Sequence, residues 1–408
     1  MRSGDNPSSN SASGTAPSQS DVPDEKPEPR HVSRRGLFGA GAALAAATSF
    51  SWSDFAVAAD KNNKRPLSFT PDGRYETVPL AKSSISLGVA QTRVVPVELS
   101  NLKQTRMANV QHMCDLIDAA NGFTGAKDII FFHEFPITGY YHKWDLADAR
   151  KVAIELPGEE TEILAKKARE YGSWLVFGSY VRDPDWPESL LSITTIMNDK
   201  GEIVDKHWKA RNIKGFFGGG FELFTTSIYD VLDRYIEMYG EDAVLPVTRT
   251  PIGNIATSSV QREPELFRAF AMKGAEIILR TASGGFSPID MQATSLYNGV
   301  YTAVANNAAS PQNKYYFADA GGGNSAIYAP NGDELEKAAT AFETMVTQRI
   351  PIADFRARNR QPIVHSELFM PVFEKYRSRY GPNLFTDYQP KNPQDSARYL
   401  RDKARWPQ

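Results

Sequence analysis

Residues 127–140 read KDIIFFHEFPITGY, an apolar run that ends at a charged residue and then enters a turn. Four consecutive Ile and Phe side chains favour a buried β-strand over 129–132. Glu134 follows two residues after that run. A carboxylate at the end of a buried strand must be paired or face a cleft, because burying it alone costs several kcal/mol. The stretch therefore predicts a core strand and a candidate functional residue.

Outside this stretch, short apolar runs alternate with amphipathic segments from about residue 84 to 350, a rhythm that favours an α/β fold with strands layered against helices. We expect further strands within residues 85–97, 173–181 and 276–282, and two strands within 192–208 around the turn Asp199-Lys200-Gly201. We expect helices at 161–172 and at 265–275, where Pro264 stands at the first helical position.

One more helix is expected around the single cysteine of the chain. Met107, Val110, Cys114 and Ile117 are spaced by three, four and three residues, which places them on one helical face. We interpret Cys114 as a structural thiol, because apolar burial raises a thiol pKa and lowers its reactivity. A chain with one Cys excludes an internal disulfide, iron–sulfur clusters and Cys-rich zinc modules.

Composition narrows the class of protein further. The 408 residues carry 46 Lys and Arg against 48 Asp and Glu, a formal net charge of −2, which disfavours nucleic acid and anionic membrane surfaces as partners. No run approaches the roughly 18 apolar residues of a spanning helix. We find no cofactor fingerprint and no His, Asp or Glu cluster with metal-ligand spacing, so we expect neither a cofactor nor a metal.

The N-terminal segment resembles an export signal. Residues 1–30 have few large apolar side chains, which predicts disorder. Arg34 and Arg35 then precede a short Ala-rich stretch, and Ala56-Val57-Ala58 offers small residues for cleavage, as in twin-arginine signals. We expect a mature chain that starts near Ala59 and is periplasmic or secreted. A chance basic pair before a disordered linker is the alternative.

We expect three parts in the chain. Residues 1–59 form the leader, 60–350 a single domain without internal repeats, and 351–408 a C-terminal extension. This extension is basic and aromatic, and we expect it to pack on the domain or at a subunit interface, with a solvated tail as the alternative.

Three reactive side chains stand at the ends of apparent strands, where loops form pockets on a rigid scaffold. They are Glu134, Lys209 at the end of KHWK, and Ser258 at the junction between a strand and a helix start. Backbone N–H groups at such a junction are available to bind an oxyanion.

The order of these motifs resembles the carbon–nitrogen hydrolase (nitrilase) superfamily, most closely its aliphatic amidase and formamidase branch. The resemblance covers about residues 84–345 and rests on FHEFPITGY, KHWK, a strand followed by Pro-Glu and AMKGAE, YTAVANN, and GGGNSAIYAPNGDEL. It implies a four-layer αββα sandwich with two central sheets, association into a homodimer or larger homo-oligomer, and hydrolysis of a small non-peptide amide.

The resemblance also implies roles for the three residues. Glu134 matches the family's general base and Lys209 the lysine that stabilises the tetrahedral intermediate. Ser258 stands six residues before Pro264, where the family has its nucleophilic Cys. Ser259 and Val260 replace the acidic residue that often follows the Cys.

Two further departures lie after Lys209. Phe217 occupies the place where the family often has a second Glu, and Glu222 is a possible substitute nearby. Residues 223–246 look like an insertion that covers the pocket.

Three functional interpretations stay open, because a Ser hydroxyl is much harder to deprotonate than a thiol. The first is a Ser-dependent amidase, and the second is a non-catalytic relative that binds a small amide or acts as a structural partner. The third is a different mechanism, by directly activated water or by a Ser-His-Asp site with His133 or His207. Contact of the Ser258 hydroxyl with both Glu134 and Lys209 favours catalysis, whereas a pocket filled by Phe216 or Phe217 favours the non-catalytic interpretation.

We expect structural roles for both histidines. Successive strand residues point to opposite faces, so His133 points away from Glu134. Arg262, near the start of the helix after Ser258, is a candidate partner either for a substrate carboxylate or for Glu265.

Overall fold

The computed structural model describes residues 70–216, 220–309 and 322–406. The leader of residues 1–59, with Arg34, Arg35 and the expected start near Ala59, lies outside the described residues, as does Phe217.

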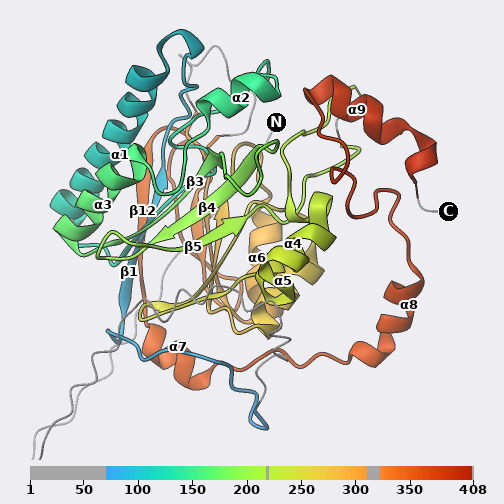
Figure 1. Ribbon diagram of the computed structural model, residues 1–408. Helices are drawn as coiled ribbons and strands as arrows, with labels where there is room; N and C mark the ends of the chain where they lie inside the picture. The colour runs from blue at the N-terminus through green and yellow to red at the C-terminus, as the bar shows by residue number, and fades with distance from the viewer. Residues whose placement is uncertain (1–69, 217–219, 310–321, 407–408) are drawn as a thin grey trace, which may run out of the picture. The chain divides into compact units, whose positions relative to one another are not determined.

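Two six-stranded sheets form the centre of the domain (Figure 1). Sheet A has the order β12-β1-β2-β3-β4-β5, and sheet B has the order β11-β10-β9-β8-β7-β6. The strands of sheet A are β1 (Ile85–Gln91), β2 (Ile129–Phe132), β3 (Trp174–Val181), β4 (Leu191–Met197), β5 (Ile203–Trp208) and β12 (Thr344–Ile350). The strands of sheet B are β6 (Thr248–Thr250), β7 (Gly253–Ser258), β8 (Ile277–Thr281), β9 (Tyr301–Ala305), β10 (Ala326–Tyr328) and β11 (Glu334–Lys337).

Each sheet has a parallel centre, and this decides where loops can meet. β1, β2 and β3 are parallel, with Leu87 opposite Ile129 and Ile129 opposite Trp174. β7, β8 and β9 are likewise parallel, whereas the remaining pairs are antiparallel. The carboxyl ends of parallel strands lie at one edge of their sheet, so the residues that follow β7 and β8 are neighbours.

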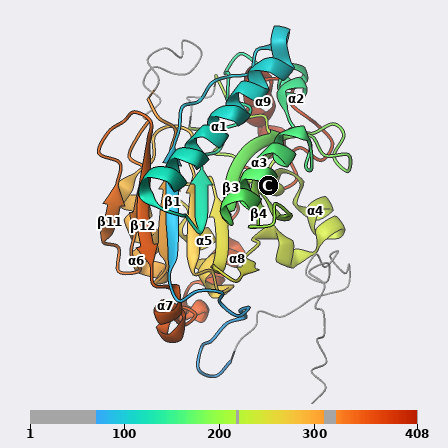
Figure 2. The ribbon, with the colours of Figure 1, turned by 90° about the vertical axis from the view of Figure 1, so that its left-hand side faces the viewer.

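Helices cover the outer faces of the sheets (Figures 1 and 2). The α-helices are α1 (Leu102–Thr124), α2 (Leu146–Val152), α3 (Glu159–Tyr171), α4 (Leu232–Tyr239), α5 (Pro264–Met272), α6 (Pro288–Asn298), α7 (Ile352–Arg358), α8 (Met370–Lys375) and α9 (Pro393–Arg401). The 3₁₀ helices are η2 (Leu99–Asn101), η3 (Ile228–Val231), η4 (Glu241–Val244), η5 (Ser366–Leu368) and η6 (Lys403–Arg405).

Alternation along β2 separates the layers. Ile130 and Phe132 pack in one apolar cluster with Ile117 of α1 and Leu164 of α3. Ile129 and Phe131 point the other way and pack with strand residues of sheet B.

Sheet B repeats the pattern on its outer side, where Ile278 packs against Phe267 and Phe270 of α5. The domain is therefore a four-layer αββα sandwich, which confirms the predicted fold class.

The strand and helix predictions between residues 85 and 282 are confirmed in type, and Pro264 does begin α5. Cys114 lies on α1 and is buried, as predicted, and burial raises its pKa to about 11. The sequence of the extension after residue 351 predicts no helix, but the structure contains α7, α8 and α9. These helices are short, with at most nine residues, so they carry little periodic signal.

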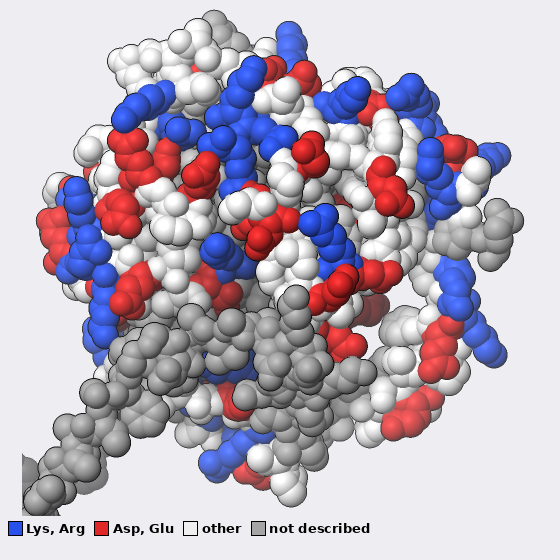
Figure 3. Space-filling model, in the orientation of Figure 1, with Lys and Arg blue, Asp and Glu red and all other residues white. Residues whose placement is uncertain are grey.

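Charges of both signs are interspersed over the face of the molecule in Figure 3, in line with the near-zero net charge. Among the described helices, none has both the length and the apolar character needed to span a membrane.

Candidate active site

Glu134 lies just beyond the carboxyl end of β2, and its exposed fraction is 5%. Gly178 on the neighbouring strand β3 makes this position possible. A Cβ atom built on Gly178 would lie 2.3 Å from the backbone oxygen of Glu134, which no side chain tolerates. The close approach of β3 to Glu134 therefore depends on the absence of a side chain at 178.

Three donors from three different strand regions converge on the Glu134 carboxylate. Lys209 Nζ lies 3.0 Å from Oε1, and Ser192 Oγ donates to the same oxygen at 3.2 Å. Ser283 Oγ donates to Oε2 at 2.6 Å. Ser192 and Lys209 belong to β4 and the end of β5 in sheet A, whereas Ser283 follows β8 in sheet B. Both sheets thus contribute to the surroundings of one carboxylate.

The backbone of Lys209 is hydrogen-bonded through both of its polar groups. Its backbone N–H donates to Ser192 O at 2.9 Å, and its own C=O accepts from Ile228 N–H at 3.1 Å. The Lys209 side chain is 13% exposed and that of Glu134 is 6% exposed. A buried ion pair of this kind is costly to break on one side, because the remaining charge is left without a partner.

Tyr140 is an aromatic neighbour of the carboxylate. Burial, and secondarily the Glu134 charge, raises the pKa of the Tyr140 hydroxyl, which keeps it protonated. Its ring is stacked on Phe135 at a centroid distance of 6.1 Å.

Ser258 ends β7 in register with Arg280 on β8, and it is 8% exposed. Its Oγ accepts a hydrogen bond from Val260 N–H at 3.1 Å. Within the part of the chain that the structure describes, Ser258 has no hydrogen bond to Glu134 or Lys209. Of the three predicted residues, Glu134 and Lys209 are therefore in contact, whereas Ser258 is hydrogen-bonded to neither of them among the described residues.

The turn after Ser258 is braced by a buried arginine that the sequence analysis did not identify. Arg280 is fully buried and donates from Nη2 to Val260 O and to Asp290 Oδ2, the latter at 2.9 Å. Asp290 Oδ1 in turn accepts from Arg262 N–H at 3.3 Å. Burial lowers the pKa of Arg280 to about 10, against the opposing effect of Asp290, so the side chain stays charged at neutral pH.

Arg262 itself adopts a positive φ of 57°, a conformation that this brace supports. Its exposed guanidinium lies 5.8 Å from the centroid of the Phe216 ring, and it makes no ion pair with Glu265 among the described residues. Phe216 is 58% exposed, so it does not fill a pocket.

Both histidines have structural partners. Burial lowers the pKa of His133 to about 3, so its ring is neutral, and Nδ1 accepts from Phe135 N–H at 3.1 Å. His207 Nδ1 lies 3.0 Å from Thr257 Oγ1, and His207 Nε2 lies 3.1 Å from Asp205 Oδ2. Neither ring is bonded to Ser258 in the described ranges, which argues against a Ser-His-Asp site.

Glu222 is buried and has a backbone partner of its own. It is 3% exposed, and its Oε1 accepts from Gly215 N–H at 2.8 Å. Burial raises the pKa of this carboxyl. It has no hydrogen bond to Glu134 or Lys209 among the described residues.

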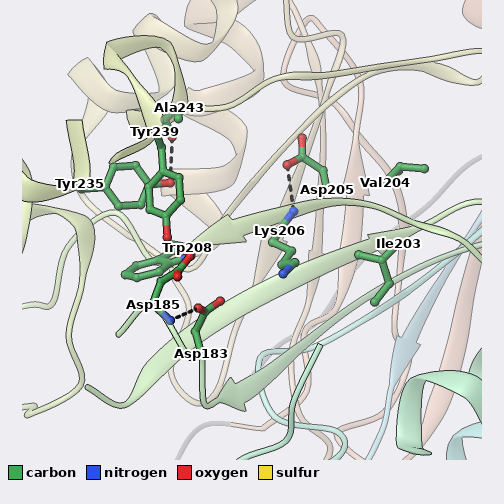
Figure 4. Close-up of a pocket in the computed structure, with 10 residues that line it drawn as sticks. All are labelled: Asp183, Asp185, Ile203, Val204, Asp205, Lys206, Trp208, Tyr235, Tyr239 and Ala243. Carbon is green, nitrogen blue, oxygen red and sulfur yellow. Dashed lines mark hydrogen bonds between the residues drawn. The ribbon is translucent and has the colours of Figure 1, made fainter. Parts of the chain in front are cut away.

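The 223–246 segment forms η3, α4 and η4 and packs against Trp208 (Figure 4). The ring centroids of Tyr235 and Tyr239 lie 5.2 and 6.4 Å from that of Trp208. A surface cavity of about 360 Å³ lies here, and its lining includes none of Glu134, Lys209 and Ser258. In the described residues, no group of three or more His, Cys, Asp or Glu side chains is suited to hold a metal ion.

Ser192 and Ser283 are the contacts that the sequence did not reveal. Ser283 lies in TASGGF after β8, where two glycines mark a loop, but nothing in the sequence places it beside Glu134. That contact arises from packing sheet B on sheet A, which a pattern within one strand does not encode.

Comparison with known proteins yields one matching family profile, described as carbon-nitrogen hydrolase, over residues 88–360. A formamidase from Helicobacter acinonychis (strain Sheeba) is 25% identical over 234 residues, which cover 55% of this chain. The match spans 63% of the formamidase, less than two-thirds of its length.

Solved structures share the fold at lower identity. The NitFhit protein of C. elegans matches with a TM-score of 0.54 and 17% identity, covering 73% of this chain and 66% of that one. An amidase from Nesterenkonia sp. matches with a TM-score of 0.50 and 16% identity, covering 73% of this chain and 100% of that one.

Proposed function

The chain belongs to the carbon–nitrogen hydrolase family, and from this premise we propose that it hydrolyses the carbon–nitrogen bond of a small non-peptide amide. The relative with formamidase activity supports an amide as substrate. The observation that carries the proposal is the buried contact of 3.0 Å between Lys209 Nζ and Glu134 Oε1 beyond the ends of two core strands. A base and a cation at one position supply the two functions that amide hydrolysis needs, proton transfer and oxyanion stabilisation.

In the proposed reaction, Glu134 is the general base and Lys209 stabilises the oxyanion. By its place in the chain, Ser258 is the first candidate for the attacking group, where the family pattern has Cys. The hydroxyl oxygen bonds to the carbonyl carbon, the amine leaves with the proton held by Glu134, and water then releases the acid. A serine ester replaces the thioester of the cysteine enzymes.

One observation favours a second candidate function, binding without turnover. Ser258 Oγ is bonded to Val260 N–H and not to the base, and the charges of Glu134 and Lys209 neutralise each other. A fold that keeps the ion pair for stability and binds a small amide accounts for both facts.

The decisive experiment measures ammonia release by the purified mature protein from formamide, short aliphatic amides and nitriles. Ser258→Ala and Ser258→Cys are assayed beside the wild type. Turnover by wild type that also requires Glu134, tested with Glu134→Gln, supports the hydrolase. A silent wild type with an active Ser258→Cys variant indicates an intact pocket whose nucleophile has been lost. No turnover by the wild type, Ser258→Ala or Ser258→Cys, together with saturable binding of an amide, supports the binding function.

Two further proposals concern the whole protein. We propose that it forms a homo-oligomer, which is supported by the exposed apolar side chains of Leu368, Val372 and Tyr376 in the C-terminal extension. We also propose that it is exported by the twin-arginine route, which is supported by Arg34 and Arg35 before an Ala-rich stretch.

A further inference from the structure

Two serine hydroxyls donate to the candidate base, those of Ser192 and Ser283, and the shorter contact and the less buried residue belong to Ser283. Its Oγ donates to Glu134 Oε2 at 2.6 Å, within the range expected between a nucleophile and its general base. Ser258, by contrast, is bonded to the backbone N–H of Val260 and to neither charged residue among the described residues. The two serines therefore differ in the one contact that activation requires.

We propose that Ser283 is a catalytic residue, and that it supplies the attacking hydroxyl of the amide hydrolysis. This inference rests on the proposed function and changes one role in it, the identity of the nucleophile. Ser258 then shapes the neighbouring turn.

The surroundings of the Glu134 carboxylate fit this assignment. Oε1 already accepts from Ser192 Oγ and contacts Lys209 Nζ. In the described part of the chain, the donor to Oε2 is Ser283. The base thus holds Ser283 on one oxygen and Lys209 on the other, which places the nucleophile and the oxyanion-stabilising cation on one carboxylate.

Ser283 also has room for a substrate. The residue is only partly buried, unlike Glu134 and Ser192. Gly284 and Gly285 follow it, and a Cβ atom built on Gly285 would meet no atom within 4 Å. The loop that carries Ser283 is therefore open at Gly285, two residues further on.

The loops that carry the two serines are tied together. Gln261, three residues after Ser258, donates from Nε2 to Gly285 O at 3.0 Å. Gly284 N–H also donates to Asn306 Oδ1 at 3.1 Å, which fixes the backbone directly after Ser283. The loop that carries Ser283 is therefore held by Asn306, directly after β9, and by the turn after Ser258.

The Ser283 Oγ–carbon bond forms while the hydroxyl proton moves to Glu134 Oε2, and Lys209 stabilises the carbonyl oxyanion. The carbon–nitrogen bond breaks as the proton passes from Glu134 to the leaving nitrogen. Water then gives a proton to Glu134 and bonds to the carbonyl carbon. The Oγ–carbon bond breaks, and the proton returns to Ser283 as the acid leaves.

The first test compares amide turnover by Ser283→Ala and Ser258→Ala, with Ser287→Ala as the matched control. Ser287 lies in the same loop and its side chain makes no capping hydrogen bond to α6. We expect Ser283→Ala to lose about 100-fold or more in turnover, the Ser287→Ala control to lose less than about tenfold, and Ser258→Ala to lose less than Ser283→Ala. Acid-quenched wild type should carry the acyl group on the peptide that contains residue 283. Loss in Ser258→Ala alone, with the acyl group on its peptide, would overturn the inference and leave the proposed hydrolysis standing.

The second test does not depend on turnover. Ser283→Cys and Ser258→Cys each introduce one thiol, and the pH dependence of its alkylation gives its pKa. The native thiol of Cys114 is buried with a pKa of about 11, so it does not mask the signal. Adding Glu134→Gln removes a negative charge beside the thiol, and we expect this to lower the pKa of the thiol at 283 by roughly 1 unit. A shift at 258 that equals or exceeds the shift at 283 would contradict the assignment, even if the wild type shows no turnover.

Discussion

At the scale of single residues, the chemistry of the candidate site depends above all on Glu134 and Lys209. The two groups are buried and 3.0 Å apart, so each one compensates the desolvation of the other. A substitution of either residue is therefore expected to change both the turnover rate and the free energy of unfolding, and both must be measured.

We predict that Lys209→Met destabilises the protein by about 3–5 kcal/mol, because Glu134 keeps a buried charge without its partner. We also predict that it lowers amide turnover by about 10²–10³-fold through loss of oxyanion stabilisation. Denaturant unfolding measures the first effect and steady-state kinetics the second. Lys206→Met on β5 is the matched control, because Lys206 is exposed and its side chain donates, among the described residues, to Leu156 O at 3.4 Å and not to a carboxylate.

Removing both charges separates the two effects. Glu134→Gln combined with Lys209→Met should recover most of the lost stability and none of the turnover. Stability that stays as low in the double variant as in Lys209→Met would show that the ion pair is not the cause.

The residue types of the candidate site were partly accessible from the sequence. Glu134, Lys209 and Ser258 can be identified because each stands at the end of an apparent strand, and because Glu134 and Lys209 match family motifs while Ser258 occupies the place of the family's Cys. Ser283 and Arg280 cannot, because their contacts join strand ends and loops that are remote in the sequence. A contact between two sheets depends on how the sheets pack, and the spacing of apolar residues within one strand or helix does not predict that packing.

At the scale of elements, the contact between β1 and β12 closes sheet A on one side. Glu343 stands directly before β12 and reaches back to the segment after β1. It accepts from Thr92 Oγ1 at 2.9 Å and from Arg93 N–H at 3.1 Å, and it lies 2.7 Å from His112 Nε2 of α1. One carboxylate thus ties two strands and a helix together.

We predict that this carboxylate gives the fold a pH dependence. Burial alone would raise the pKa of Glu343, but His112, Arg93 and Thr92 together lower it to about 2. Because the folded-state pKa is below the unfolded value of about 4.3, the stabilisation is complete above that value and is lost as the pH falls toward 2. Glu343→Gln should therefore destabilise the protein at pH 7 by about 1.5–3 kcal/mol and much less at pH 3. Denaturant midpoints of both proteins from pH 7 to pH 3 measure this, and a pH-independent difference would refute the assignment.

The sequence predicts the type of the helices and strands in the domain better than it predicts their first and last residues. It predicts the helices of the C-terminal extension least well. The run of Ile and Phe in β2 and the turn around Gly201 between β4 and β5 contain enough local signal to be read directly. The helix α9 is different. Its Ala397 and Leu400 are buried, and Leu400 packs in the apolar cluster that includes Phe385, so tertiary packing supplies most of its stability.

For the molecule as a whole, the C-terminal extension bears on the proposed oligomer. Leu368, Val372 and Tyr376 recur every four residues and are 81%, 65% and 67% exposed. We predict concentration-dependent self-association that Val372→Asp together with Tyr376→Ser weakens by at least about tenfold, because these changes remove buried apolar area at the contact. Sedimentation velocity measures it. Phe123→Asp is the control, since Phe123 is 90% exposed on α1, and a monomer at all concentrations would contradict the proposal.

The leader offers a second prediction at this scale. Replacing Arg34 and Arg35 together by Lys should abolish export in a host with a twin-arginine pathway, although the positive charge is unchanged. Fractionation followed by detection of the precursor and of the shorter mature chain gives the result. Export that proceeds normally in the double variant would contradict the proposed route.

The close approach at Gly178 restricts which substitutions the protein can accept during evolution. A methyl group at this position would collide with the backbone of Glu134, just beyond the end of β2, although position 178 takes no part in the reaction. Selection for activity would then act on residue 178 as strictly as on the base itself. In a saturation-mutagenesis library sorted by turnover, position 178 should accept only glycine, and lineages that have given up catalysis should be the ones in which it drifts.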